Sequence, residues 1–297
     1  MNQDWLEAFP ALGTETLSAL RRFIDGAFRH FTREHGEALE NFFEPLRQFL
    51  LLSERLLTQS PWPLVMAGIA LVAWLASRSM KIVAGTLLTL LAIGILGMWE
   101  DTMKTISMIF VCTVVAIAVG LPVGIVMSRS DRLQRYVNPT LDVMQTMPSF
   151  VYLIPVVMLL GIGRVPGLIA VVIYAIPPVI RFTNLGIRLV DKDLLEAADA
   201  FGSSGWQRMR QVQLPLALPT IMAGINQTIM LSLSMVVIAS MIGVQGLGQP
   251  VLKAITNQYF TMGLLNGMAI VGIAIVFDRA SQAYGKRLQK HLEVQHG

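Results

Sequence analysis

Residues 194–219, LLEAADAFGSSGWQRMRQVQLPLALP, form a charged, glycine-containing segment between two apolar runs, at 166–185 and 218–242. Apolar runs of about 20 residues are long enough to cross the hydrocarbon core of a bilayer as helices. A polar segment between two such runs therefore predicts a loop that leaves the membrane. The segment thus indicates a helical membrane protein with a structured loop.

The composition supports a membrane protein with several spans. Of 297 residues, 54% are hydrophobic and only 14% are charged, against about 25% charged in a typical soluble domain. The hydropathy pattern predicts an all-α, polytopic bundle of about seven transmembrane helices. The predicted spans are 62–77, 82–99, 105–128, 143–162, 166–185, 218–242 and 262–280.

The distribution of Lys and Arg predicts the orientation, because cytoplasmic loops carry an excess of these residues. One set of loops holds most of them: Arg78, Lys81, Arg129, Arg132, Arg135, Arg188, Lys192, Arg208, Arg210, Lys286, Arg287 and Lys290. The opposite set holds Lys104, Arg164 and Lys253. We expect the first set, the 194–219 segment and the C-terminus to be cytoplasmic, and the N-terminus to lie outside.

The chain divides into four predicted parts. Residues 1–61 are amphipathic, without the pattern of a secretory signal peptide, and predict helices at the membrane interface or against a partner, or a peripheral tail without chemistry. Residues 62–99 predict two peripheral spans. Residues 100–285 predict a core of five spans with a loop at 191–216, and 286–297 a basic cytoplasmic tail. The single cysteine, Cys112, lies in an apolar run and is expected in the core.

Several enzyme classes are excluded by missing motifs. The sequence contains no GxxxxGK[ST], HExxH or GxSxG, and its four histidines, His30, His35, His291 and His296, lie in the tails. The glycine-rich stretch 243–248, GVQGLG, follows a predicted span and is read as a turn that allows close backbone packing. We therefore expect no catalytic residue, metal site or cofactor in this chain, and no nucleic-acid partner.

Ionisable groups are scarce within the spans between residues 105 and 277. Asp142 and Arg181 are the candidates, and both lie near predicted span ends. Ion-coupled carriers usually bury such groups at mid-membrane, which disfavours a self-powered carrier. Sodium binding by backbone carbonyls of unwound helices stays open.

Prolines and small polar residues mark several spans. The prolines are Pro122, Pro148, Pro155, Pro166, Pro177 and Pro178; the polar residues are Gln145, Thr146, Ser149, Asn226, Gln227, Thr228, Ser232 and Ser234. The prolines fit either simple packing geometry or a path through the membrane. The polar groups fit either hydrogen bonds between helices or the lining of such a path. The sequence leaves both alternatives open and assigns no substrate-binding residue.

The 194–219 segment itself predicts two short helices. Asp193 and Glu196 have the spacing of a capping box, so a helix should begin at Asp193, and Gly202 is placed to end it in a left-handed conformation. Ser204 and Gln207 repeat the capping-box spacing and predict a second helix that stops by Pro215. Such a unit is too small to bury its own apolar face, so it should dock on its own membrane domain or on a partner.

The same segment resembles the EAA signature of the membrane subunits of ATP-binding-cassette importers. That signature has the form E-A-A, three residues, G, nine residues, I, one residue, L-P. The matching residues here are Glu196, Ala197, Ala198, Gly202, Val212, Leu214 and Pro215, with valine in place of isoleucine. The resemblance implies that these residues form a coupling helix, which fits a cleft on a separate ATPase subunit.

The resemblance extends from about residue 100 to the C-terminus. MQTMPSFVYLIPVVMLLGIG, VPGLIAVVIYAIPPVIRFTNLGIR and PTIMAGINQTIMLSLSMVVIASMIGVQGLGQPVL are similar to the ProW-like permeases for glycine betaine, proline betaine and choline. This implies the core of a type I ABC importer permease in the bacterial inner membrane, which acts as a homodimer.

The implied partners are a cytoplasmic ATPase that binds ATP and Mg, an extracytoplasmic substrate-binding protein, a second copy and membrane lipid. The implied cargo is choline, glycine betaine, proline betaine or carnitine. An ion-coupled secondary transporter and a non-transporting scaffold are the alternatives.

Overall fold

The computed structural model describes residues 12–294, and every regular element in that range is helical. Four helical stretches are long and apolar enough to cross a membrane, and two bent helix pairs raise the number to six. The four are Trp99–Ser128, Arg164–Arg188, Gly205–Ile242 and Phe260–Gln289. A shorter apolar helix, Met80–Ile95, matches the remaining predicted span. The prediction of an all-α, multi-span bundle is confirmed.

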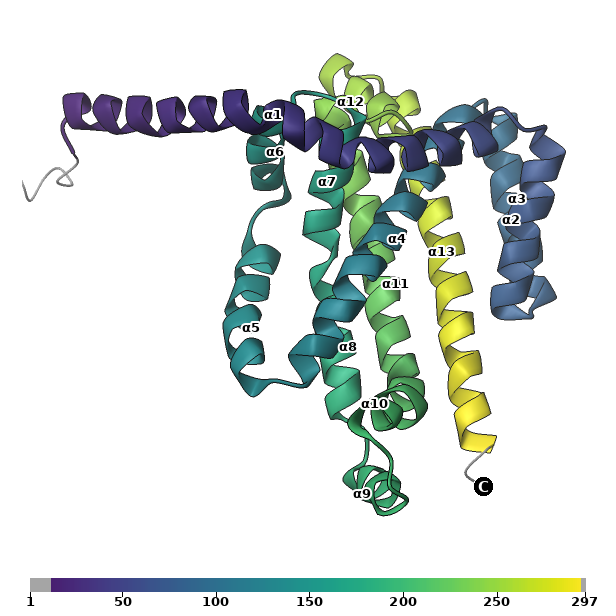
Figure 1. Cartoon of the computed structure of the whole chain (residues 1–297). Helices are drawn as coiled ribbons and strands as arrows, with labels where there is room; N and C mark the ends of the chain where they lie inside the picture. The colour runs from purple at the N-terminus through teal and green to yellow at the C-terminus, as the bar shows by residue number, and fades with distance from the viewer. Residues whose placement is uncertain (1–11, 295–297) are drawn as a thin grey trace, which may run out of the picture.

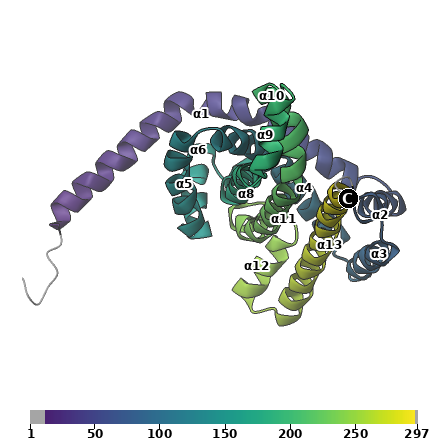
Figure 2. The same ribbon diagram turned by 90° about the horizontal axis from the view of Figure 1, so that it is seen from below.

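The N-terminal region is a single long helix, α1 (Thr14–Thr58), where several helices were expected. It lies across one end of the bundle and meets α2 (Trp62–Ser77) at an angle of 111°. Its second half packs on the bundle through Leu50, whereas its first half extends past the bundle edge (Figures 1 and 2). Residues 1–11 of the predicted N-terminal part lie outside the described residues.

Helices α2 and α3 (Met80–Ile95) form an antiparallel pair at the side of the bundle, where they pack on α13 (Phe260–Val294) (Figure 1). Each has 16 residues, about 24 Å at 1.5 Å per residue. Arg287 on α13 donates a hydrogen bond to the carbonyl of Leu75 at 3.1 Å. The pair is therefore attached at the periphery.

The core consists of α4 (Trp99–Ser128), α7 (Arg164–Ala175), α8 (Pro177–Arg188), α11 (Leu214–Ala239) and α13 (Phe260–Val294). Helix α8 packs between α4 and α11 because glycines let the backbones approach. A Cβ on Gly124 would lie 2.6 Å from Cβ of Thr183, and one on Gly224 would lie 2.6 Å from Cβ of Phe182. Cys112 is fully buried, as predicted.

The predicted span 143–162 contains a break that the prediction did not include. Helix α5 (Asp131–Thr146) ends there, and after a turn of 3-10 helix (Ser149–Tyr152) the chain forms α6 (Leu153–Leu160), bent by 110° from α5. The cause is Pro148: it forces Met147 into an extended conformation, with φ −65° and ψ 132°. Hydropathy predicted the apolar content of this region but not its break.

The bundle has two unlike ends. We call the end covered by α1 and α12 (Gly248–Asn257) the distal end, and the end with α9 (Lys192–Ala200) and α10 (Gly205–Arg208) the proximal end (Figure 1). The turn between α4 and α5 and the end of α13 also lie at the proximal end. The predicted tail 286–297 begins inside α13, which continues to Val294, and residues 295–297 lie outside the described range.

Candidate functional site

The N-cap of α9 lies two residues earlier than predicted. Asp191, not Asp193, is the N-cap: its Oδ1 accepts a hydrogen bond from the backbone N–H of Asp193 at 3.0 Å. The predicted capping box at Asp193 and Glu196 is therefore wrong, because two aspartates compete for one cap and the earlier one takes it. Asp193 instead occupies the first turn, where a carboxylate interacts favourably with the helix dipole.

The end of α9 has the geometry that the sequence predicts. Gly202 has φ +77°, a left-handed conformation that a residue with a Cβ adopts at a cost. The N–H of Ser203 donates to the carbonyl of Ala198 at 3.1 Å, and that of Gly202 donates to Asp199 at 2.9 Å. These two bonds form a Schellman motif, which ends α9 and reverses the chain.

Helix α10 begins at the predicted capping box. Ser204 Oγ accepts from the N–H of Gln207 at 3.3 Å, and Gln207 Oε1 accepts from the N–H of Ser204 at 2.8 Å. The predicted stop by Pro215 is wrong. A π-helical turn (Met209–Gln213) connects α10 directly to α11, and the N–H of Leu214 donates to the carbonyl of Met209.

The π turn lets the helix pass Pro215, because a wider turn relieves the missing N–H and the ring clash that a proline brings to an α-helix. Packing holds it in place: Met209 is buried with Ile187, Ala217 and Ile221. As a result, helical structure runs without a gap from Gly205 to Ile242.

The seven signature residues lie in two different environments. Glu196, Ala197 and Gly202 are exposed, and Ala198 is half-buried. Val212, Leu214 and Pro215 are half-buried on the bundle. The first group therefore forms a free surface, and the second group anchors that surface to α11.

Specific contacts join α9 to α10, which form the protruding unit, and connect this unit to the bundle. An ion pair between Arg208 and Asp199 joins α10 to α9. The guanidinium of Arg129, just after α4, lies 5.9 Å from the ring centre of Trp206, within the range of a cation–π contact. A cavity of about 490 Å³ lies beside these groups. The pairing partners lie up to 77 residues apart in sequence, so periodicity gives no signal for them.

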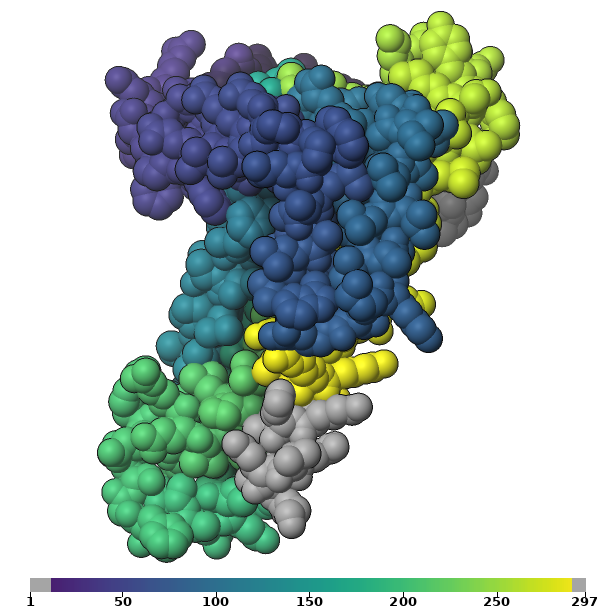
Figure 3. Space-filling view, turned by 90° about the vertical axis from the view of Figure 1, so that its right-hand side faces the viewer, coloured from purple at the N-terminus to yellow at the C-terminus, as the bar shows by residue number. Residues whose placement is uncertain are grey.

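Helix α9 has no buried residue, and Phe201 at its end is 92% exposed. Figure 3 shows the unit as a lobe that projects from the proximal end. The small side chains of Ala197 and Ala198 beside Phe201 would let another surface approach closely. Within residues 12–294, no element of this chain covers the outer face of α9.

The polar residues of α11 that the sequence singles out lie in different environments. Asn226 donates to Asp278 Oδ1 on α13 at 3.1 Å and accepts from Ser281, so it joins two helices. Gln227 and Ser234, seven residues apart on one face of α11, are exposed on the surface of the chain. Asp142 and Arg181, the two ionisable residues near predicted span ends, form an ion pair between α5 and α8.

Comparison with known proteins shows the family. Residues 116–290 match the family described as binding-protein-dependent transport system inner membrane component. The chain belongs to this family. It is therefore a multi-pass inner-membrane component of a transport system and not an enzyme.

Individual relatives agree with this membership. The chain is 43% identical to the glycine betaine/proline betaine transport system permease protein ProW of Escherichia coli K12, over 95% of this chain and 82% of that protein. It is 46% identical to the glycine betaine/carnitine transport permease protein GbuB of Listeria monocytogenes, over 76% of this chain and 81% of that protein.

The fold is similar to that of a solved transporter. A chain of the MetNI methionine ABC transporter in an inward-facing conformation matches with a TM-score of 0.57 and 22% identity, over 62% of this chain and 93% of that chain. The predicted fold of a type I ABC importer permease is confirmed.

Proposed function

We propose that this chain is the membrane-spanning permease of an ATP-driven importer of quaternary ammonium osmolytes: choline, glycine betaine, proline betaine or carnitine. The observation that carries the proposal is the 43% identity to a glycine betaine/proline betaine permease over 95% of this chain. Such cargo is recognised through the attraction between a cation and aromatic faces. In this proposal a separate extracytoplasmic binding protein makes that selection and delivers the cargo.

The protruding unit of α9 and α10, which we call the proximal lobe, is the proposed contact with the ATPase. Its support is the combination of an uncovered α9, an exposed Phe201 and a continuous helical connection into α11. A partner cleft that moves when ATP binds would displace α9 and α10, and the continuous helix would carry that displacement into the bundle. ATP and Mg bind to the partner ATPase in this scheme.

A second copy of the chain is proposed to complete the path. Gln227 and Ser234 lie exposed on the face of α11, and polar groups facing lipid at mid-membrane are costly. In a two-fold dimer, the same face of each copy meets its equivalent. The exposed polar face of α11 then borders the path between the two copies, where a compact zwitterion passes without tight binding.

The proximal end is proposed to face the cytoplasm and the distal end the outside. The support is the number of Lys and Arg residues near the proximal end, such as Arg129, Arg188, Lys192 and Arg208, together with the positive-inside rule. The N-terminus then lies outside and the C-terminus inside.

The proposed function is tested by purification of the tagged chain from its native membrane. We expect an ATPase and a substrate-binding protein to accompany it, in a particle with two copies of the chain. Labelled choline, glycine betaine, proline betaine and carnitine are then tested for competition on that particle. Recovery of the chain without an ATPase, or uptake by the chain alone under an ion gradient, would contradict the proposal. Recovery of partners without uptake would indicate a scaffold.

A further inference from the structure

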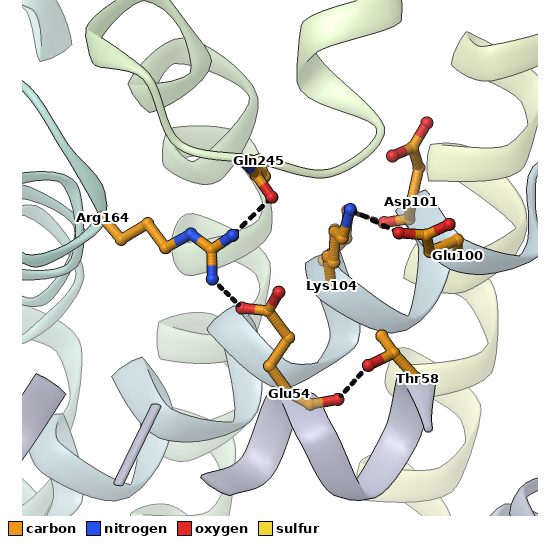
Figure 4. A network of polar contacts seen from close by, with 8 residues as sticks. Glu54, Thr58, Glu100, Asp101, Lys104, Arg164 and Gln245 are labelled. Carbon is orange, nitrogen blue, oxygen red and sulfur yellow. Dashed lines mark hydrogen bonds and ion pairs between the residues drawn. The ribbon is translucent and has the colours of Figure 1, made fainter. Parts of the chain in front are cut away.

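A polar network at the distal end joins three segments that are far apart in sequence (Figure 4). Arg164, the first residue of α7, donates from Nη1 to Glu54 Oε2 on α1 at 2.7 Å. Its Nη2 donates to Oε1 of Gln245. Gln245 belongs to residues 243–247 between α11 and α12, which we call the distal loop. One guanidinium therefore connects the N-terminal helix to this loop.

The ion pair is partly buried, unlike most pairs on a protein surface. The side chain of Glu54 is 15% exposed and that of Arg164 is 30% exposed. Arg164 also stands at the start of α7, where the helix dipole disfavours a cation. The carboxylate of Glu54 offsets both the burial and the dipole. Removal of either charge would therefore leave the other partly buried without a partner.

The distal loop is closely packed by the core. Gly246 has φ +131°, and a Cβ there would lie 2.5 Å from Oγ1 of Thr105 on α4. The same Oγ1 accepts a hydrogen bond from the N–H of Leu247 at 2.9 Å. The prediction that residues 243–248 form a turn with close backbone packing is thus confirmed. Gln245 is exposed between buried neighbours, and its side chain is free to reach Arg164.

The distal loop follows directly on the helix that starts at the proximal lobe. Helical structure is continuous over the 38 residues from Gly205 to Ile242, about 57 Å at 1.5 Å per residue. In the proposed function, a displacement of α10 is passed to the distal loop along this continuous helical stretch. The response of the distal loop to such a displacement then depends on the contacts that hold the loop to α1.

We propose that Glu54 and Arg164 are positioning residues that, through Gln245, hold the distal loop against α1. Helix α1 then serves as a fixed support for the far end of α11 during transport, and the loop moves only as α10 moves. Arg164 and Gln245 lie within the family match at 116–290, whereas Glu54 lies outside it. The inference rests on the proposed function for its meaning in transport, but the restraint itself is measurable without transport.

The restraint is tested with two spin labels on the full assembly in lipid nanodiscs. Labels are attached at Arg55→Cys on α1 and Lys253→Cys on α12, both exposed positions, while the buried Cys112 stays unlabelled. We expect a narrow distance distribution in the otherwise native chain. Glu54→Gln and Arg164→Gln should each broaden it, and the exchanged pair Glu54→Arg with Arg164→Glu should narrow it again.

Two further variants separate the restraint from general damage. Gln245→Ala changes an exposed loop residue and leaves the ion pair intact, so it should broaden the distribution without affecting folding. Lys104→Gln removes a charge at the same end whose salt bridge is to Glu100, within α4, at 2.7 Å. This control should leave the distribution unchanged.

A second readout measures the role in transport. Stimulation of ATP hydrolysis by the loaded binding protein should fall at least about fivefold in Arg164→Gln, the lower end of coupling between linked sites. The basal rate should stay unchanged, and the exchanged pair should recover the stimulation. Unchanged distances in Glu54→Gln, Arg164→Gln and Gln245→Ala would overturn the inference, as would an exchanged pair that restores neither readout. Normal distance responses in an assembly that takes up no osmolyte would contradict the proposed function and support the restraint.

Discussion

Replacing Gly202 with alanine should uncouple transport while leaving the bundle stable. Gly202 has φ +77°, and nothing lies within 4 Å of the position that a Cβ would occupy. The cost is therefore backbone strain alone, about 1–2 kcal/mol for a left-handed residue with a Cβ. A free-energy difference of about 1.4 kcal/mol corresponds to a tenfold change in an equilibrium constant. The observed conformation at Gly202 therefore becomes roughly 5- to 30-fold less populated relative to other arrangements of α9.

The strain should lower the rate of ATP-driven uptake without lowering the stability of the bundle, because α9 has no buried residue. The assay is the rate of ATP-driven uptake by the reconstituted assembly, together with the thermal unfolding temperature of the chain. We expect reduced uptake and an unchanged unfolding temperature. Gly202→Asn should have a smaller effect, since asparagine tolerates a left-handed conformation.

Gly205→Ala is the matched control. Gly205 also has open space around it, but it begins α10 and is not in a left-handed conformation. The same added methyl group should therefore leave uptake unchanged or slightly improved. Equal uptake by Gly202→Ala and Gly205→Ala would refute the reasoning, because only Gly202 has the left-handed backbone conformation that the methyl group strains.

Two further predictions concern the stability of the core. Gly124→Ala should destabilise the bundle by about 1–3 kcal/mol through overpacking against Thr183, seen as a lower unfolding temperature in detergent; Gly68→Ala, with open space on α2, should not, and an equal loss in both would contradict the packing argument. Thr105→Val should cost about 1–3 kcal/mol, because the buried N–H of Leu247 loses its acceptor. Thr105→Ser keeps the hydroxyl and should recover most of that stability; a serine variant as unstable as the valine variant would exclude the hydrogen bond as the cause.

Local rules were enough to predict the features of the proximal lobe that depend on near neighbours. Gly202 ends α9, and Ser204 with Gln207 begins α10, because each effect spans only a few residues. The same rules failed where two choices competed, as with Asp191 and Asp193 at the start of α9. The EAA signature predicts which segment couples to an ATPase, whereas the structure separates the exposed first half of that segment from its half-buried second half.

Features that depend on distant contacts were outside the reach of sequence patterns. The π turn before Pro215 is held by the packing of Met209 against residues of α8 and α11. The hydropathy pattern does not predict that contact. The ion pair of Glu54 and Arg164 joins residues 110 apart. By contrast, the break at Pro148 had a local cause in the proline itself, which an average over a long apolar window hides.

The most direct test of the central claim is the uptake of labelled glycine betaine into proteoliposomes. One preparation contains the complete assembly of this chain, its ATPase and its binding protein, and the other contains this chain alone. The account predicts uptake that requires ATP in the first preparation, and none in the second under a sodium or proton gradient. Gradient-driven uptake by the chain alone, or uptake by the assembly without ATP, would contradict it.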